Sequence, residues 1–373
     1  MRILFLSHTY WGSPYRIGSH HLSSQMAADG HDVFYISTPV SLLHRLKYAA
    51  DDARMMRAGL ITSIRPGLRQ WIPQTLSPAG IAFFRGWDFC ELGLGGQLRK
   101  ANAAIGCEPF DVVFIDEPRL AGFLRIFPSR IVVYRPTDIY ASMGIRNWRA
   151  LESHILSNAD ALICTSAPLL DFLSREFNFK GLARIQVNGV DYEHFLPATD
   201  VPLEYKAELR RKCLYVGALD FRFDADAFEQ MARANPDVVF FVIGGGDSAI
   251  QAQITALENV SFLGFRPYSD IPSYMQHADM AVLPVRPGPS NDGRSPMKIY
   301  EYLACGLPVL AYGAAELRRR QLPGLLFYAG QSDIEAAFSQ LRKAERFAFV
   351  DRSLHWHNIA RVLLDSLPGG AMK

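Results

Sequence analysis

Residues 3–37 read ILFLSHTYWGSPYRIGSHHLSSQMAADGHDVFYIS, and this stretch decides the fold class. It begins with the apolar run Ile3–Leu6, predicts a helix over 19–28 and ends in a second strand over 32–37. Strand, loop, helix and strand within about 35 residues form a βαβ unit. Strands that are apolar along their whole length are typical of parallel sheets covered on both faces. The sequence therefore predicts an α/β protein.

The same alternation continues along the chain. In the N-terminal half it predicts strands over 112–115, 131–134, 161–164 and 185–187, and helices over 147–158 and 168–177. In the C-terminal half it predicts strands over 213–216, 238–243, 260–263, 280–283, 308–311 and 325–328, and helices over 224–234, 249–257, 270–277, 297–305, 333–347 and 356–367. Strands and helices in this order form doubly wound sheets.

A proline-containing stretch at 197–204 separates the two series. We therefore expect two Rossmann-like domains, over 1–197 and 203–350, and a C-terminal helix within 351–373 that packs back toward the first domain. Doubly wound sheets bind ligands beyond the carboxyl ends of their strands. In a two-domain arrangement both sets of strand ends face a central cleft, so the loops after the strands are expected to carry the chemistry.

Composition excludes several classes of protein. The 373 residues carry 39 Lys and Arg against 37 Asp and Glu, so the net charge of +2 does not indicate a nucleic-acid binder. The five cysteines are scattered without a CxxC pair, which excludes a zinc knuckle and a disulfide scaffold. No apolar run has the length of a signal peptide or a membrane span. We expect a cytoplasmic protein, soluble or peripheral to a membrane.

Residues 41–105 differ from the rest. They hold nine Lys and Arg against four Asp and Glu, interleaved with aromatic residues. Two interpretations remain open. The segment is either a solvated lid with buried aromatic side chains, or it docks on an anionic membrane leaflet with basic groups over the headgroups. In the second, Trp71, Phe83, Phe84 or Trp87 enters the interface.

Residues 244–249, GGGDSA, match the dinucleotide-binding pattern GxGxxA. They follow the second strand of their domain, whereas a dinucleotide fingerprint follows the first. The alternative is a tight turn whose backbone N–H groups approach a phosphate.

Residues 295–309, SPMKIYEYLACGLPV, are the most informative segment. Ser295 is a candidate N-cap, and Pro296 suits the first helical position. Lys298 lies in the first turn, where a cation is unfavourable to the helix dipole unless an anion binds there. Glu301 lies one turn further, placed to accept hydrogen bonds from ribose hydroxyls. The alternative is a surface Lys–Glu pair.

That segment resembles the nucleotide-sugar signature of GT-B glycosyltransferases. Three further segments agree with the likeness: 188–191 (NGVD), 215–219 (YVGAL) and 260–265 (VSFLGF). The resemblance implies two Rossmann-like domains with the donor held mainly by the second. It assigns donor binding to Gly217, Leu219, Phe265, Arg266, Met297, Lys298 and Glu301.

Within that superfamily the chain is most similar to the membrane-associated β-glucuronosyltransferases of xanthan-type exopolysaccharide assembly, the GumK type. The likeness rests on 6–16, 133–138, 188–191 and 295–298. It implies that Asp138 is the catalytic base and that Met297 and Lys298 hold the donor. The family has glutamine where this chain has Glu301, and an acidic residue where it has Phe265, so the donor sugar and the nucleotide are open.

The sequence favours an inverting mechanism. Many retaining GT-B enzymes have a second glutamate eight positions before the first, and here that position is Gly293. Inversion needs a single base to take the acceptor proton. Asp138, after the strand at 131–134 and near Arg135, is our candidate. Its alternative roles are a helix cap or a partner for Arg135, and Asp116 and Glu117 are the reserve bases.

Four further residues are candidate phosphate ligands: Arg16 and His20 toward an acceptor diphosphate, and Arg286 and Arg294 toward the departing one. A solvated or hydrogen-bonded His20 is the alternative. We expect no metal or other cofactor. The predicted function is transfer of a sugar from a nucleotide donor to a lipid-linked glycan acceptor at the inner leaflet. The rivals are a nucleotide-sugar 2-epimerase and a non-catalytic nucleotide-sugar-binding subunit.

Overall fold

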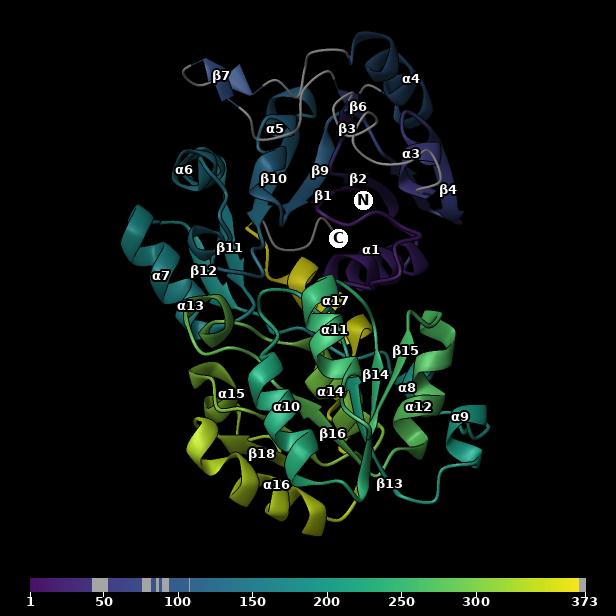
Figure 1. The fold of residues 1–373 in the computed structure, drawn as a ribbon. Coiled ribbons are helices and arrows are strands. Elements are labelled where there is room, and N and C mark those ends of the chain that lie inside the picture. Colours follow the sequence, from purple (N-terminus) through teal and green to yellow (C-terminus); the bar gives the residue numbers. More distant parts are fainter. Residues whose placement is uncertain (42–52, 76–81, 85–86, 89–93, 107, 369–373) are drawn as a thin grey trace. The chain divides into compact units, whose positions relative to one another are not determined.

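The computed structural model describes residues 1–41, 53–75, 82–84, 87–88, 94–106 and 108–368 (Figure 1). The chain forms two compact units. The N-terminal unit holds Met1–Val187 and Trp356–Lys373, and the C-terminal unit holds Asn188–His355. The first unit thus ends at Val187, ten residues before the domain boundary expected at 197.

The N-terminal unit is built on one eight-stranded sheet with the order β12-β11-β10-β9-β1-β2-β5-β4. All neighbours are parallel except β4 and β5, which form an antiparallel edge pair. The strands are β1 (Arg2–Ser7), β2 (Asp32–Ser37), β4 (Ile61–Arg65), β5 (Leu68–Trp71), β9 (Phe110–Ile115), β10 (Ser129–Tyr134), β11 (Ala161–Cys164) and β12 (Leu182–Ile185). Its longer helices are α1 (Gly18–Ala28), α4 (Gly95–Ile105), α6 (Trp148–Asn158), α7 (Ala167–Phe177) and α17 (Trp356–Asp365), with the short α3 (Ala53–Arg57) and α5 (Phe123–Ile126).

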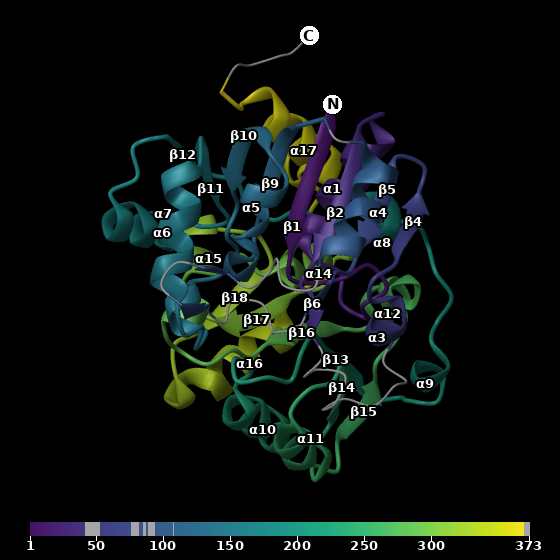
Figure 2. The same ribbon diagram turned by 90° about the horizontal axis from the view of Figure 1, so that it is seen from above.

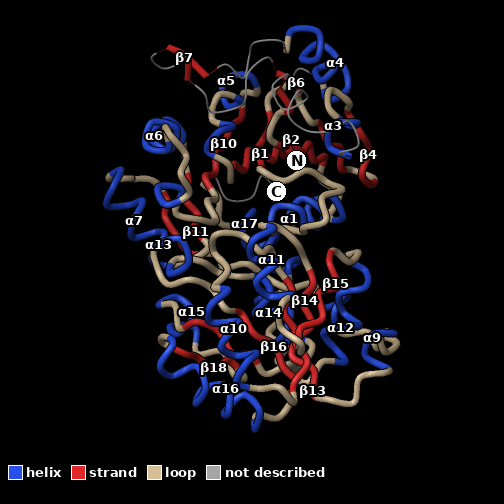
Figure 3. Tube along the Cα trace, in the orientation of Figure 1, coloured by secondary structure: helices blue, strands red, loops and turns tan. Residues whose placement is uncertain are grey.

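The C-terminal unit has a six-stranded parallel sheet with the order β15-β14-β13-β16-β17-β18. The strands are β13 (Arg211–Val216), β14 (Val238–Ile243), β15 (Val260–Gly264), β16 (Met280–Leu283), β17 (Val309–Tyr312) and β18 (Leu325–Tyr328). The helices include α8 (Tyr192–Phe195), α9 (Leu203–Lys206), α10 (Ala225–Ala234), α11 (Ser248–Thr255), α12 (Ile271–His277), α13 (Pro289–Asp292), α14 (Met297–Ala304), α15 (Ala315–Arg320) and α16 (Ile334–Lys343). Strands fill the middle of each unit and helices surround them (Figure 3).

Both sheets have the strand order of a doubly wound fold. Across the C-terminal sheet, for example, the third, second and first strands of the unit (β15, β14, β13) are followed by the fourth (β16). The order reverses between β1 and β9 in one unit and between β13 and β16 in the other. Ligands of such sheets bind at these switch points. The expected strands are present, with one shift: the strand expected at 185–187 lies at 182–185.

The basic segment is partly integrated into the N-terminal sheet, because β4 and β5 extend it beyond β2. The indole of Trp71 is 1% exposed and packs edge-on against Phe123 and Phe127. The expectation that Trp71 enters a membrane interface is therefore wrong, since its ring is part of the hydrophobic core of this unit. Phe83, Phe84, Arg85 and Trp87 fall outside the residues whose side chains the structure describes.

Helix α17, at the end of the chain, belongs to the N-terminal unit and lies against α1 (Figure 2). The ring of Trp356 stacks on His21 with centroids 5.1 Å apart, and His357 Nδ1 lies 3.5 Å from Asp29 Oδ1. Burial of Trp356, Ile359 and Leu363 on one face of the helix explains why it packs back onto this unit.

Glu152 on α6 is fully buried, and it accepts a 2.5 Å hydrogen bond from the Tyr134 hydroxyl. Burial raises the pKa of this carboxyl to about 7, against the opposing effect of the Tyr134 hydrogen bond. The folded protein therefore keeps a proton that the unfolded chain releases above about pH 4.5. Stability attributable to this group falls as pH rises from about 4.5 to 7 and is level above that.

We expect Glu152→Gln to flatten this pH dependence, because glutamine keeps the hydrogen-bond acceptor without the charge. Above pH 7 the variant should melt a few degrees higher than the parent, since about 1 kcal/mol shifts Tm by roughly 2–4 °C in a domain of about 150–250 residues. Melting curves between pH 4.5 and 8 would measure it. Glu108→Gln, at an exposed carboxylate of the same unit, is the matched control. Parallel curves for parent and Glu152→Gln would contradict the assignment.

Candidate functional site

The N-terminal unit gathers titratable side chains after three adjacent strands. His8 follows β1, Asp116 and Glu117 follow β9, and Asp138 follows β10. Asp116 is buried, and its Oδ2 accepts hydrogen bonds from the hydroxyls of Ser7 and Ser19. Its Oδ1 lies 3.8 Å from His8 Nδ1. A buried carboxylate anchored in this way holds a neighbouring imidazole in one orientation.

His8 lies in the stretch 6–16 on which the family likeness rests, but the sequence assigned it no role. Burial alone would lower the pKa of its imidazole, but the hydrogen bond and charge of Asp116, with the charges of Glu117 and Asp138, raise it above 6.5. These contributions also show that His8 shares its surroundings with all three carboxylates. Only its position directly after β1, at the switch point, marked it in the sequence.

The carboxylates of the cluster differ in how they are engaged. The Glu117 carboxylate accepts from the backbone N–H of Arg119 and, through both oxygens at 2.8 Å, from its guanidinium. Asp138 is half-buried, and its Oδ2 accepts from the Thr137 hydroxyl at 2.9 Å. Arg135 is buried, so the pKa of its guanidinium falls to about 10 despite the attraction of Asp116. The Arg135 charge therefore interacts with Asp116. Asp138 is only three residues further along the chain.

His20 is not placed to bind a phosphate. The side chain is 1% exposed, its Nε2 donates to Thr9 O at 3.2 Å, and its Nδ1 accepts from the backbone N–H of Ile17 at 3.4 Å. Burial, followed by the charge of Arg16, lowers its pKa well below 6.5. His20 is therefore a neutral group that caps α1, and the alternative interpretation of it was correct. Arg16, the other residue predicted to face an acceptor diphosphate, lies over the ring of Trp11.

In the C-terminal unit, the predicted Lys298 and Glu301 pair forms at the start of α14. The ammonium of Lys298 contacts Glu301 Oε2, and Glu301 is 1% exposed whereas Lys298 is 24% exposed. The pair is thus not a surface pair, because its carboxylate is buried. Met297 is half-buried at the first position of the helix.

The start of α14 differs from the expectation. The N-cap is Pro296, and no side chain caps the helix. The hydroxyl of Ser295 hydrogen-bonds to Tyr300 OH at 3.0 Å, and its carbonyl accepts from Asn188 Nδ2. Ser295 is therefore not a cap. Among the described residues, no side chain caps the first backbone N–H groups of α14, which is the arrangement that suits an anion.

Tyr302, which the sequence did not single out, ties α14 to the loop after β13. Its hydroxyl accepts a 2.7 Å hydrogen bond from the backbone N–H of Val216, directly before Gly217. The hydroxyl group is fully buried, so it has little freedom to release that bond. This contact fixes the end of β13 relative to the helix that bears Lys298.

The glycines at 244–246 are explained by packing between loops. A Cβ on Gly244 would lie 1.9 Å from Gly217 O, and one on Gly246 would lie 2.3 Å from Leu219 O. The backbone N–H of Gly244 donates to Gly264 O, and that of Asp247 to Leu219 O. The amides of Gly244 and Asp247 are thus engaged within the protein. At these two positions the loop fits neither the dinucleotide fingerprint nor a phosphate cradle.

Three predicted donor residues lie on these loops. Leu219 is fully buried, and its N–H donates to Gly245 O. Phe265 is 51% exposed, and its ring lies against Gly245, where a Cβ would be 2.7 Å away. The Arg266 guanidinium pairs with Glu204 at 3.0 Å and contacts Tyr274, so it braces α9 against α12.

The remaining predicted cations lie after β16. Arg286 is exposed, and its Nε donates to Phe223 O at 3.1 Å; Arg294 is half-buried two residues before Pro296. In the part of the chain that the structure describes, no group of His, Cys, Asp and Glu side chains is arranged to hold a metal ion. Over the same residues, no helix combines the length and hydropathy that crossing a bilayer requires.

Two family models match separate parts of the chain. Residues 210–344 match the model described as glycosyl transferases group 1, and residues 5–79 match the model of the N-terminal domain of the glucuronosyltransferase GumK. A putative teichuronic acid biosynthesis glycosyltransferase of Bacillus subtilis, TuaH, is 27% identical over 191 residues. That alignment spans 48% of this chain and 47% of the relative, about half of its length.

Solved structures show the same fold. Sucrose-phosphate synthase from Thermosynechococcus elongatus superposes with a TM-score of 0.69 at 17% identity, covering 97% of each chain. Anabaena HepE in complex with UDP and glucose superposes with a TM-score of 0.59 at 17% identity, covering 96% of this chain and 92% of that one.

Proposed function

Because this chain has the GT-B fold and is related to group 1 glycosyl transferases and to GumK, as the sequence predicted, we propose that it transfers a sugar from a nucleotide-diphosphate donor to a hydroxyl group. The acceptor is a lipid-linked glycan of bacterial exopolysaccharide or cell-surface glycan synthesis. UDP is the preferred nucleotide, supported by the UDP complex of HepE, and glucuronic acid is the candidate sugar. The observation that carries the proposal is the uncapped start of α14 beside Lys298 and a buried Glu301.

The donor is held by α14. The uncapped N–H groups at the start of its first turn and the Lys298 ammonium offset the negative charge of the diphosphate, which grows as the bond to the sugar breaks. Glu301 is a fixed acceptor for ribose hydroxyls, because burial leaves its carboxylate few other orientations. Tyr302 keeps the Gly217 loop in register with this helix.

The acceptor is activated in the N-terminal unit. Asp138 takes the proton of the acceptor hydroxyl while the oxygen attacks the anomeric carbon and the nucleoside diphosphate leaves. One displacement inverts the anomeric configuration. His8, whose raised pKa favours the cation, offsets part of the negative charge of the three carboxylates.

Donor and acceptor assays test the proposal. We expect release of UDP from one UDP-sugar among a panel of UDP-, GDP- and ADP-sugars, and only when lipid extract is present. The anomeric carbon of the product should have the inverted configuration. A 2-epimerase would instead isomerise the nucleotide sugar without acceptor. A binding subunit would retain affinity and release nothing.

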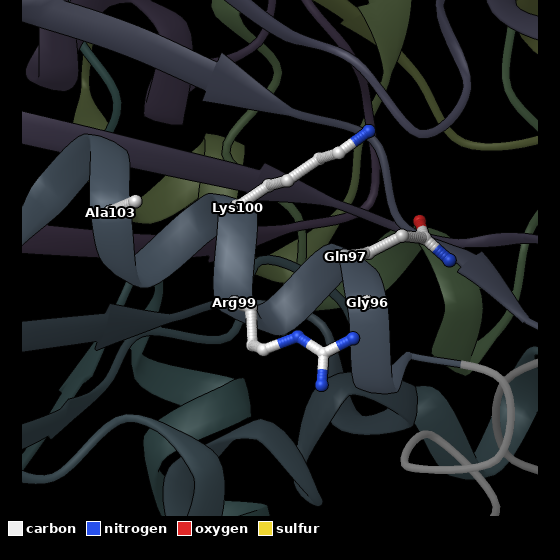
Figure 4. Close-up of a pocket in the computed structure, with 5 residues that line it drawn as sticks. All are labelled: Gly96, Gln97, Arg99, Lys100 and Ala103. Atoms are coloured by element: carbon white, nitrogen blue, oxygen red, sulfur yellow. The ribbon is translucent and has the colours of Figure 1, made fainter.

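We also propose that part of the basic segment faces an anionic membrane. Helix α4 buries Ala101 and Ile105 and exposes Arg99 and Lys100, which extend from it beside a surface hollow (Figure 4). Each basic residue near such a surface contributes about 1 kcal/mol. Arg69 is less suited to this role, because it forms a 2.6 Å ion pair with Asp32.

Binding to vesicles containing phosphatidylglycerol is therefore expected to fade with salt and to weaken when Arg99 and Lys100 are changed to glutamate. Donor affinity should not change. The matched control is Arg175→Glu with Lys180→Glu, at exposed basic residues of the same unit. Equal binding to neutral vesicles would refute the electrostatic part of this proposal.

A further inference from the structure

The loop between β1 and α1, residues 8–17, is held from several elements through Trp11. The Trp11 side chain is 8% exposed, and the Arg16 guanidinium lies 4.5 Å above its ring. Arg57 of α3 donates to Trp11 O at 3.1 Å, and the backbone N–H of Trp11 donates to the Gln70 side chain on β5. Two guanidinium groups therefore approach one tryptophan in a loop at the carboxyl edge of the sheet.

A third guanidinium lies next to this loop. Arg54, one turn of helix before Arg57, donates to the carbonyl and the hydroxyl of Thr38 at 2.6 and 2.5 Å. The Thr38 hydroxyl in turn donates to His8 O at 2.9 Å, which joins the loop after β2 to the loop after β1. Arg16 and Arg57 thus contact Trp11 directly, and Arg54 is linked to the same loop through Thr38. We name Trp11, Gln70 and these three arginines the Trp11 site.

The Trp11 site also contains hydrogen-bond donors that lack an acceptor. Trp11 Nε1 and Gln70 Nε2 are buried, and neither has a hydrogen-bond partner among the described residues. A buried donor without an acceptor costs roughly 1–3 kcal/mol. Trp11 Nε1 and Gln70 Nε2 can only donate, as can the guanidinium groups beside them, so donors gather at this site. A set of donors of this kind is complementary to an anion with several oxygens.

The backbone leaves room for a cation at this place. Gly12 has φ +97°, and a Cβ there would lie 2.1 Å from Arg57 Nη1. A residue with a side chain would displace the guanidinium from the loop. Burial, followed by the charge of Arg16, lowers the pKa of the neighbouring His20, so the Arg16 guanidinium acts on this part of the loop.

We infer that the Trp11 site binds a phosphate group, and that its ligand is the diphosphate of the lipid-linked acceptor. This inference rests on the proposed function for the identity of the acceptor. The site occupies the same loop as His8, so it lies at the switch point where ligands of a doubly wound sheet bind. A phospholipid headgroup has the same phosphate chemistry. Trp11 and the unpartnered donors are buried, however, so a single diphosphate that enters the protein fits this site better than the headgroups of a flat bilayer.

The probe is geranyl diphosphate, a short water-soluble prenyl diphosphate, titrated into the full-length protein with UDP present to occupy the donor site. We expect Arg16→Gln and Arg57→Lys each to weaken its binding by roughly 10-fold or more, as for the loss of a charge-assisted hydrogen bond. UDP affinity should stay unchanged. Arg175→Gln, at an exposed arginine of α7, is the matched control and should bind as the parent does. Arg16→Gln is informative even if Arg57→Lys fails to fold, because the Arg16 guanidinium stacks on the ring and does not hold the Trp11 carbonyl.

Unchanged binding of geranyl diphosphate by a folded Arg16→Gln variant would overturn the inference. So would a loss confined to vesicles containing phosphatidylglycerol, which would identify a headgroup as the ligand. Geraniol should not bind, since it lacks the diphosphate. Diphosphate binding that depends on Arg16 in a protein without transferase activity would refute the proposed function and leave this site standing. Sugar transfer with diphosphate binding independent of Arg16 would do the reverse.

Discussion

Asp138→Asn is expected to lower the rate of sugar transfer by about 10²–10⁴-fold, the usual contribution of a general base. Asparagine keeps the shape of the side chain and its contact with Thr137, but it cannot take a proton. The base acts only as the transition state develops, so the loss should appear in kcat and not in donor affinity. Single-turnover transfer assays and titration of UDP would measure the two separately.

Asp171→Asn, at an exposed aspartate of the same unit, is the control for this substitution and should transfer sugar at the parent rate. Near-normal turnover of Asp138→Asn would move the base elsewhere in the cluster. The structure then favours Asp116 with His8 over Glu117, because both oxygens of Glu117 are engaged by Arg119. A product with retained anomeric configuration would remove the need for a single base.

Lys298→Ala is expected to weaken binding of the nucleoside diphosphate by about 1.5–3 kcal/mol, the range for a hydrogen bond to a charged group. Binding of the nucleoside alone should barely change. Removal of the ammonium also leaves the buried Glu301 carboxylate without its cation, which destabilises the fold. Melting curves of the double variant Lys298→Ala with Glu301→Gln identify the loss of stability caused by the unpaired carboxylate, because this variant removes both charges. Affinity is compared on Lys298→Ala alone, since Glu301 is proposed to contact the ribose. Calorimetry with uridine and UDP measures affinity, and melting curves measure stability.

The matched control is Arg320→Ala, which removes a cation from the buried Glu316 on the neighbouring helix α15. We expect it to lower stability without a selective loss of UDP affinity. If Lys298→Ala weakens binding of uridine and UDP equally, the ammonium does not contact the diphosphate, and the assignment of α14 as the diphosphate site fails.

The candidate site was predictable where a local pattern encodes it. The misplaced cation at Lys298 and the acid one turn later identify α14 without any knowledge of the sheet, because both lie on one helix. The pairing of His8 with Asp116 was not predictable in this way, since 108 residues separate them and only adjacent strands bring them together. The same holds for Arg57 and Trp11, whose contact requires α3 to pack beside the first loop.

The sequence by itself determined the order of strands and helices, the doubly wound class and the placing of Lys298 and Glu301 on one helix, because apolar period and turn residues act over a few neighbouring positions. Only the tertiary structure decided which polar side chains are buried and with what partner. In the folded protein Trp71 is buried in the core, and His20 is a neutral group that caps α1. The Ser295 hydroxyl hydrogen-bonds to Tyr300, and His8 lies near three carboxylates that raise its pKa. The reason is physical: desolvation and charge depend on everything within a few ångströms of a group, and in a parallel sheet those neighbours come from distant parts of the chain.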